Sequence, residues 1–498
     1  MIDSTKLARQ DLSSIKWRNA GGIGTLNLVM RFGKTLVALL AINKMLVKND
    51  KVDIVIVTPS VAVKQEWEDQ ITKYSIIEKL PEPYTLNQSI VDYIRVYTAN
   101  QVIDEELKIT CDLLIIDEVH RFTSDKRIRL LRKEIINNKY LMCLTGSMPG
   151  GDMRSKIVSY APIVDIITEE EALKNGWISS FIEFNVPLEF PENDKLEYRH
   201  YSNIIKDVLK KFKDLYKKFR WKDGSYVFNN DFDLIIACYS GKSTVYRYMK
   251  AEEVREGIRA QLSWNTDLAN EWTDEYIKDM AYKFNKSIAK RNDLLVNSIV
   301  KLNAVLTIFK NNPVSTICFN ESTSFADVIC DAINNNIKRC AICYHSNIAT
   351  APMIDPITGT WILYGERSVR AGEIKKFGKD SVKKLAIEGM RDGTYTFLST
   401  ARALDEGLTI ASLEQVITTA GTANPMQYSQ RSARGKTVDI YNLNKVTKIY
   451  NLYFDDFKII NEEGEVEFVK SRDKTKLYLR QSNNRNDIVT LNLIDLIE

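Results

Sequence analysis

The stretch Asn27–Leu40, NLVMRFGKTLVALL, decides the fold class. It begins as an apolar, strand-like run, turns at Gly33–Thr35, and continues with helical spacing. A phosphate-binding loop typically has this context: it follows a strand, contains a glycine turn, and leads into a helix that starts with Lys and Thr. The first glycine of the pattern G-x-x-x-x-G-K-[ST] is Leu28 here. The stretch therefore predicts an α/β domain with a phosphate site in a loop that departs from the usual pattern.

Length and composition indicate a multidomain globular protein. A chain of 498 residues is too long for one hydrophobic core and predicts two or three domains. Apolar residues make up 44% and charged residues 27%, which is ordinary for a globular chain. We expect a cytoplasmic protein without a membrane partner, since no apolar run approaches ~20 residues and the first residues do not resemble a signal peptide.

The seven cysteines stand mostly in apolar, strand-like contexts, which predicts buried free thiols. Cys340 and Cys343 form one C-x-x-C, but no second pair or histidine follows at zinc spacing. Two core cysteines on a strand are therefore favoured over a zinc or redox role for this pair.

Apolar runs of five to seven residues alternate with helix-like segments in two parts of the chain. They do not alternate with polar residues, which is typical of strands buried on both faces of a parallel sheet. The first part contains TLNLVM, VDIVIVT, YIRVYT, CDLLIID, YLMCLT and FIEFNV, and the second contains VSTICF, RCAICY, YTFLST, QVITT and VDIYNL. We predict two doubly wound α/β lobes.

Between the lobes, apolar residues at helical spacing with lysines on the opposite face predict a mainly helical block. For these lysines we favour a solvated surface over a contact with DNA. The predicted domains are residues 1–190 (first lobe), 191–312 (helical block), 313–447 (second lobe, with an inserted hairpin at 350–370) and 448–498 (C-terminal extension).

The segment LLIIDEVHRF places two carboxylates, Asp117 and Glu118, after a buried strand, where ligands of open α/β sheets bind. Mg²⁺ prefers oxygen ligands, so Asp117 and the Thr35 hydroxyl are candidate metal ligands. Glu118 can then orient and deprotonate the attacking water. A strand that simply ends in solvated acids is the alternative.

The loop itself carries the phosphate chemistry. Gly33 lets the backbone approach a phosphate, and Lys34 reaches the β- and γ-phosphates at a helix N-terminus. Arg31 and Phe32 can form the turn in place of the missing first glycine.

In the second part of the chain, PMQYSQRSARGKT brings Gln430, Arg431 and Arg434 within five residues. Arginine recognises phosphate with two parallel hydrogen bonds. From a second lobe it can act as an arginine finger. By itself, QRSAR is more often a basic surface turn.

The order of these segments resembles the superfamily 2 DNA helicases and translocases. The similarity covers about residues 7–445, interrupted by the helical block. The segments that carry it are RFGKT, TPS, VYTANQ, DEVH, TGS, STICFNESTSFAD, STARALDEGLTI and QYSQRSAR. The segment STARALDEGLTI resembles the corresponding segment of Swi/Snf-type translocases of double-stranded DNA. The compact two-lobe layout resembles phage-encoded helicases that remodel branched DNA.

The resemblance implies two RecA-like lobes, ATP and Mg²⁺ as cofactors, and DNA as the partner of a monomer. It implies that His120 and Gln430 link nucleotide state to lobe closure, that Arg9 and Gln10 read adenine, and that Arg431 lies beside the finger Arg434. It assigns contacts with the nucleic-acid backbone to Thr58, Thr98, Thr400 and Gly407. Departures from the family pattern are Ala433, Thr437 and Thr409.

The sequence thus predicts an ATP-dependent DNA helicase or translocase that unwinds or remodels branched DNA. Its net charge of +4 and pI near 8.4 neither demand nor exclude nucleic acid, because a local basic groove is enough. The alternatives are a duplex translocase that does not separate strands and a nucleotide-gated binding module without motor activity.

Overall fold

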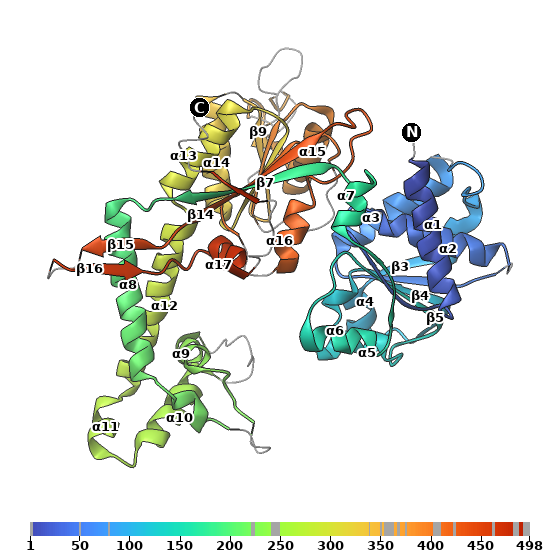
Figure 1. The fold of residues 1–498 in the computed structure, drawn as a ribbon. Helices are drawn as coiled ribbons and strands as arrows, with labels where there is room; N and C mark the ends of the chain where they lie inside the picture. Colours follow the sequence, from blue (N-terminus) through green and yellow to red (C-terminus); the bar gives the residue numbers. More distant parts are fainter. Residues whose placement is uncertain are drawn as a thin grey trace. The chain divides into compact units, whose positions relative to one another are not determined.

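The structure is a computed structural model, and Figure 1 shows its fold. It describes residues 3–48, 51–77, 80–220, 225–240, 250–337, 339–348, 351–352, 363–365, 369–373, 376–401, 410–421, 425–460, 464–481 and 488–491. The chain forms two compact units. The first contains Met1–Asn185, Ile308–Asn451 and Tyr478–Leu491, and the second contains Val186–Thr307, Leu452–Leu477 and Asn492–Glu498.

The N-terminal lobe of the first unit is built on a six-stranded sheet of order β3-β2-β4-β5-β1-β6, in which every neighbouring pair is parallel. Its strands are β1 (Ile23–Leu28), β2 (Ile54–Thr58), β3 (Ile94–Thr98), β4 (Ile109–Ile116), β5 (Ile136–Thr145) and β6 (Ile163–Ile167). Its helices include α1 (Ser4–Asn19), α2 (Lys34–Leu46), α3 (Val61–Thr72), α4 (Ala99–Asp104), α5 (Asp125–Leu131), α6 (Gly151–Val158) and α7 (Glu169–Lys174). The predicted doubly wound lobe is confirmed.

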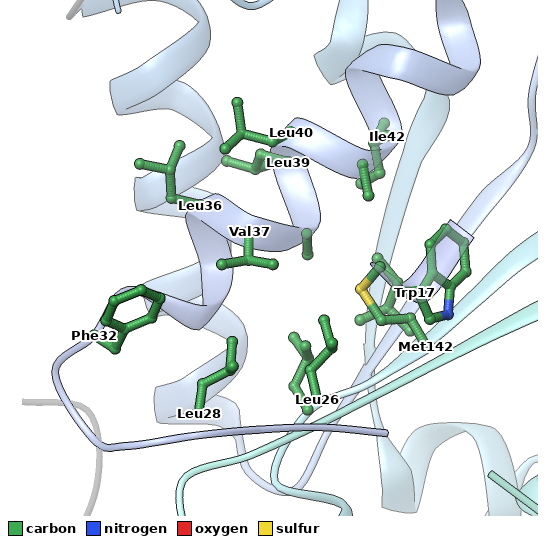
Figure 2. Packing of buried hydrophobic residues seen from close by; sticks show 14 of the residues in the cluster. Trp17, Leu26, Leu28, Phe32, Leu36, Val37, Leu39, Leu40, Ile42 and Met142 are labelled. Carbon is green, nitrogen blue, oxygen red and sulfur yellow. The ribbon is translucent and has the colours of Figure 1, made fainter. Parts of the chain in front are cut away.

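Strand β2 shows why these apolar runs become central strands. Ile54 and Ile56 pack into one hydrophobic cluster, with α1, α2 and α3, whereas Val55 and Val57 pack into a second cluster, with α4, α5 and α6. Figure 2 shows part of the first cluster, where side chains of α2 lie over β1. Each fully buried aliphatic side chain stabilises the fold by about 1.5–3 kcal/mol. Apolar residues on both faces are therefore required, and the non-alternating pattern follows.

A seven-stranded sheet of order β17-β7-β14-β13-β8-β12-β9 forms the second lobe. Its strands are β7 (Ser180–Leu188), β8 (Thr316–Asn320), β9 (Ala341–His345), β12 (Phe397–Ala401), β13 (Gln415–Thr418), β14 (Val446–Phe454) and β17 (Ile488–Thr490). Its helices are α13 (Ile299–Asn311), α14 (Thr323–Asn336), α15 (Lys379–Asp392) and α16 (Pro425–Ser432). This confirms the second predicted α/β lobe.

Two strand assignments from the sequence are wrong. FIEFNV was placed in the first lobe, but it forms β7, which lies in the second sheet beside β14. There the buried Glu183 carboxylate accepts a hydrogen bond of 2.9 Å from Asn451 of β14. VDIYNL was predicted to be a strand, but it forms a turn. The backbone N–H of Tyr441 donates to the Asp439 side chain, and β14 begins only at Val446.

The second unit is mainly helical, as predicted for the block between the lobes. Its helices are α8 (Glu192–Lys211), α9 (Asp231–Ser240), α10 (Ala251–Leu262), α11 (Thr266–Glu271) and α12 (Asp274–Val296). By length and composition Asp274–Asn311 could span a membrane, but half of its apolar window is buried within the protein, as in a core helix.

The C-terminal part of the chain also packs into this unit. It contributes the antiparallel pair β15 (Phe457–Ile460) and β16 (Val466–Val469) and the start of α17 (Lys474–Gln481). The ammonium of Lys301 and the carboxylate of Asp473, 1% and 2% exposed, form an ion pair of 2.8 Å. A buried charge pair of this kind fixes the position of two segments, because either charge alone would be costly to bury.

The predicted hairpin insertion is described in part. At its base β10 (Ala351–Pro352) pairs antiparallel with β11 (Lys376–Phe377), and the Tyr364 N–H donates a hydrogen bond of 2.9 Å to the Glu373 carbonyl. Trp361, in the middle of the predicted insertion, lies outside the described residues, as do Gly407 and Thr409.

Candidate nucleotide-binding site

The loop before α2 turns without the first glycine of the phosphate-loop pattern. Arg31 has a φ of +68° and Gly33 a φ of +100°, so two left-handed residues bring the chain from β1 into the helix. A Cβ on Gly33 would lie 2.5 Å from the side-chain nitrogen of Gln10. Glycine is therefore required at position 33 both by its backbone conformation and by this close approach.

Gln10 supports the loop from behind. Its side chain is 4% exposed, and Nε2 donates a hydrogen bond of 2.6 Å to the Phe32 carbonyl. The sequence assigned Gln10 to adenine recognition. The structure places it against the loop backbone, where it holds the turn that presents Lys34.

A pocket at the end of this loop brings together most of the predicted catalytic residues. From the first lobe it is lined by Gly33, Lys34, Thr35, Asp117 and Glu118, and from the second by Gln430 and Arg434. These residues come from segments almost 400 positions apart. Met30, Arg31, Val63, Glu66, Trp67 and Ala433 complete the lining.

Two carboxylates and one ammonium dominate the electrostatics of the pocket. Lys34 is hydrogen-bonded to Glu118, and its Nζ lies 3.8 Å from Oδ1 of Asp117. Burial raises the pKa of Asp117 to about 6 despite the nearby Lys34. Burial acts in the same direction on Glu118, but the ammonium of Lys34 outweighs it and the pKa of Glu118 is lowered. Glu118 is thus held as an anion by the lysine that the sequence assigned to phosphate.

Glu118 is also held in an uncommon backbone conformation, with a φ of +48°. Its own N–H donates 2.9 Å to Oδ1 of Asp117. Left-handed residues other than glycine cost of order 1 kcal/mol or more and persist where their surroundings impose them, often at functional sites.

Trp67 is a site residue that the sequence did not reveal. It lies on α3, is 1% exposed, and its indole N–H donates 2.8 Å to Oδ2 of Asp117. In the sequence it occupies an apolar position of the helix that follows TPS, which is typical of a core residue. Only the packing of α3 against β2 and β3 shows that the indole N–H of Trp67 reaches and orients a carboxylate.

From the second lobe, Gln430 of α16 and Arg434, just beyond its end, face the pocket. The backbone there contacts the phosphate loop, because Nε of Arg31 donates 3.3 Å to the carbonyl of Ala433. Arg431 is placed differently. It donates 3.0 Å to the Ala420 carbonyl and lies over the Phe319 ring, outside the pocket lining.

Comparisons with known proteins agree with this arrangement. Residues 24–149 match the model of the family described as type III restriction enzyme, res subunit. The fold is similar to the crystal structure of the Hef helicase domain of Pyrococcus furiosus, with a TM-score of 0.50 and 13% identity over 97% of this chain and 100% of that one. None of the curated protein sequences compared with the chain matches it. The chain therefore has two RecA-like lobes.

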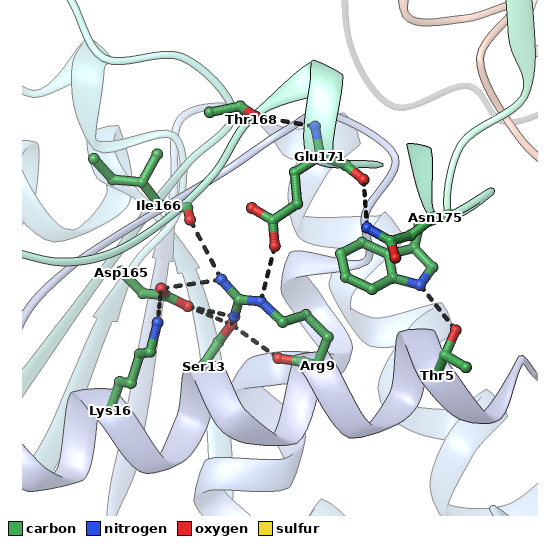
Figure 3. Close-up of polar contacts among 10 residues, drawn as sticks. Thr5, Arg9, Ser13, Lys16, Asp165, Ile166, Thr168, Glu171 and Asn175 are labelled. Carbon is green, nitrogen blue, oxygen red and sulfur yellow. Dashed lines mark hydrogen bonds and ion pairs between the residues drawn. The ribbon is translucent and has the colours of Figure 1, made fainter. Parts of the chain in front are cut away.

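Arg9, the other predicted adenine-reading residue, takes part in a polar network away from the pocket (Figure 3). Its guanidinium lies 2.7 Å from Asp165 of β6 and 3.2 Å from Glu171 of α7. Lys16 and Ser13 also contact Asp165. In this position Arg9 ties α1 to the edge of the first sheet.

His120 connects two of the family-like segments. Its Nδ1 lies 3.0 Å from the Thr145 hydroxyl, at the end of β5, and 3.3 Å from Oε2 of Glu118. Burial lowers the pKa of His120 to about 4, so the ring is neutral at pH 7. His120 is therefore a neutral link between Glu118 and the TGS segment rather than a charged partner.

The residues predicted to touch nucleic acid are buried at strand ends, with hydroxyls that bond locally. Thr58 donates 3.2 Å to the Tyr97 carbonyl, Thr98 caps α4, and Thr400 donates 2.8 Å to the Tyr344 carbonyl. Gly407 lies outside the described residues. Contact of these positions with a DNA backbone stays a prediction.

The pKa of Asp117 predicts the acidic limb of the pH profile of ATP hydrolysis. Because the folded-state pKa is raised, the ionised carboxylate needed for catalysis is lost as pH falls through about 6. The Trp67 hydrogen bond lowers this pKa, so Trp67→Phe is expected to move the limb of kcat/KM for ATP to higher pH. Measured pH profiles test this.

A matched control for that change is Trp17→Phe. Trp17 is also buried in the first lobe, and its replacement by Phe also removes an indole hydrogen bond, in this case to the Leu141 carbonyl. Its pH profile should coincide with that of the wild type. Superimposed profiles for all three proteins would show that Trp67 does not set the ionisation of Asp117.

Proposed function

We propose that this chain hydrolyses ATP and uses the cycle to unwind or remodel DNA, as a superfamily 2 helicase or translocase. One observation carries the proposal. A single pocket unites Lys34, Asp117 and Glu118 of one RecA-like lobe with Gln430 and Arg434 of another. Two lobes that both contribute to one nucleotide site are the arrangement by which hydrolysis can be coupled to lobe movement.

The residues present suit a nucleotide with Mg²⁺. Asp117 and Thr35 offer a buried carboxylate and a hydroxyl, the oxygen donors that Mg²⁺ prefers. When bound, Mg²⁺ would neutralise charge on the β- and γ-phosphates. The N–H groups at the start of α2 supply further anion-binding capacity.

The ion pair between Lys34 and Glu118 suggests how the binding of ATP activates Glu118 as a base. A γ-phosphate competes for the Lys34 ammonium and draws it from Glu118. Loss of this partner removes the main influence that lowers the pKa of Glu118, so its carboxylate becomes a stronger base. Glu118 is then able to orient a water and accept its proton.

Arg434 supplies positive charge from the second lobe. It lines the same pocket as Lys34, so closure of the lobes would bring a guanidinium to the γ-phosphate. Gln430, one helical turn earlier, is placed to hydrogen-bond the phosphate or the water.

DNA as the substrate rests on the order of the sequence segments and on the similarities to helicase-related proteins. Branched DNA, a monomeric state and a phage origin in a host cytoplasm are parts of the proposal that follow from the resemblance and from a composition rich in Lys, Ile and Asn.

The test is ATP hydrolysis without nucleic acid and with single-stranded DNA, duplex DNA, a four-way junction or RNA. We expect DNA to stimulate hydrolysis at least tenfold, because closure of both lobes requires a bound strand. The best-stimulating form separates a helicase from a duplex translocase. An unstimulated rate with every nucleic acid would favour the alternative, a nucleotide-gated binding module.

A further inference from the structure

The C-x-x-C pair of the second lobe is separated by the geometry of its strand. Side chains along a strand alternate between faces, so Cys340 and Cys343, three positions apart, point to opposite sides. Cys343 and His345, two positions apart on β9, share one face. All seven cysteines are free and buried, so this pair is not a disulfide.

Helix α14 packs on β9 and presents further donor groups to that face. Asp327 and Cys330 are three residues apart on α14, hence on one side of the helix. Oδ1 of Asp327 lies 2.9 Å from Nε2 of His345, and the Cys343 thiol donates 3.4 Å to the Ala326 carbonyl. Donor atoms of Asp327, Cys343 and His345 all lie within 4.8 Å of one another.

The thiol of Cys330, whose sulfur accepts a hydrogen bond of 3.7 Å from Asn334, lies beside this group. Its hydrogen bond with Cys343, together with burial, strongly raises the pKa of Cys343. The donors that lie together are therefore one thiol, one imidazole and one carboxylate, with the Cys330 thiol on the same helix face as Asp327. Ligands around a tetrahedral zinc lie about 3.3–3.8 Å apart, given the usual metal–ligand bond lengths. The donors would need to move by only about 1 Å.

The histidine of this group is buried and only one of its ring nitrogens has a partner among the described residues. His345 is fully buried, and its Nδ1 has no hydrogen-bond partner among the described residues. Buried polar atoms are nearly always paired, and an unpaired one costs about 1–3 kcal/mol. Nε2 of the same ring faces Asp327, so a cation held between them would bind both groups.

We propose that Asp327, Cys330, Cys343 and His345 form a binding site for Zn²⁺. Thiolate, imidazole and carboxylate together select a borderline-soft cation over Mg²⁺. Binding releases the two thiol protons to solvent, since thiolates are the ligands. The Asp327 side chain is 52% exposed and gives the cation access, whereas Cys343 and His345 are buried. The ion would fasten α14 to β9, the edge strand of the second sheet.

The experiment measures metal binding by the full-length chain and does not depend on ATP hydrolysis. The protein is stripped with a chelator and titrated with Co²⁺ alone, and the thiolate-to-cobalt charge-transfer absorption is recorded. We expect one Co²⁺ per chain, displaced by Zn²⁺. Cys343→Ser should abolish the absorption. Asp327→Asn, a change at a half-exposed position that leaves folding intact, should weaken binding on the order of 100-fold.

Cys340→Ser is the matched control, because Cys340 is an equally buried cysteine beside the same strand but on its other face. It should keep the absorption and the affinity of the wild type. The site is refuted if the wild type shows no thiolate-to-cobalt absorption. It is also refuted if Cys340→Ser loses binding as completely as Cys343→Ser, or if Asp327→Asn binds as tightly as the wild type.

Discussion

Glu118→Gln is expected to lower the rate of ATP hydrolysis about 10³-fold, within the range that a general base contributes. The amide keeps the shape of the side chain but cannot accept the proton of water. ATP affinity should be unchanged or higher, because Lys34 no longer has an anionic partner at Glu118 that a phosphate must displace. Single-turnover hydrolysis and the binding of a fluorescent nucleotide measure the two quantities separately.

Glu66→Gln is the matched control. Glu66 lines the same pocket, and its substitution removes the same charge. It lacks the hydrogen bond to Lys34 and should stay within about tenfold of the wild-type rate. If Glu118→Gln and Glu66→Gln lower the rate equally, the loss comes from the charge of the pocket, and Glu118 is not the base.

Arg434→Ala is expected to lower the hydrolysis rate about 10³-fold or more, the lower end of the range known for arginine fingers. Arg434 lines the pocket from the second lobe, whereas the cations of the first lobe there are Arg31 and Lys34. Affinity for ATP should change less than fivefold, because the guanidinium acts on the charge that develops during transfer. The measurements are kcat and the dissociation constant for nucleotide.

Arg431→Lys separates the two arginines of the QRSAR segment. It keeps the charge of Arg431 and a donor for the Ala420 carbonyl, and the position lies outside the pocket lining. We expect a rate close to that of the wild type. The reverse result, a large loss for Arg431→Lys with little effect of Arg434→Ala, would make Arg431 the residue that senses the phosphate.

The parts of the site that could be predicted are those encoded in short, continuous segments. A strand, the Gly33 turn and the start of α2 follow one another directly, so their residue types indicate a phosphate loop. Asp117 and Glu118 follow a four-residue apolar run in the same way. In such segments, local backbone preference and burial act on neighbouring residues, and the pattern can be interpreted without knowledge of the rest of the chain.

The two errors have different physical causes, and the first is that the neighbours of a strand in its sheet are not encoded in the strand itself. FIEFNV has the apolar pattern of a central strand in either lobe, and only pairing beside β14 and the hydrogen bond from Asn451 to Glu183 assign it to the second sheet. VDIYNL has strand-like residues as well, but its Asp439 side chain bonds the backbone locally and stabilises a turn instead.

The sequence by itself determined two α/β lobes, the helical block between them, and the loop and carboxylates of a nucleotide site, because each depends on periodicity or on adjacent residues. Tertiary structure alone decided which distant groups meet. It placed the indole of Trp67 against the Asp117 carboxylate, and the guanidinium of Arg9 against Asp165 instead of in the pocket. It also placed Cys343, and not Cys340, beside His345. The direction of a side chain and the partner across a sheet depend on packing between segments, and this information is absent from local sequence patterns.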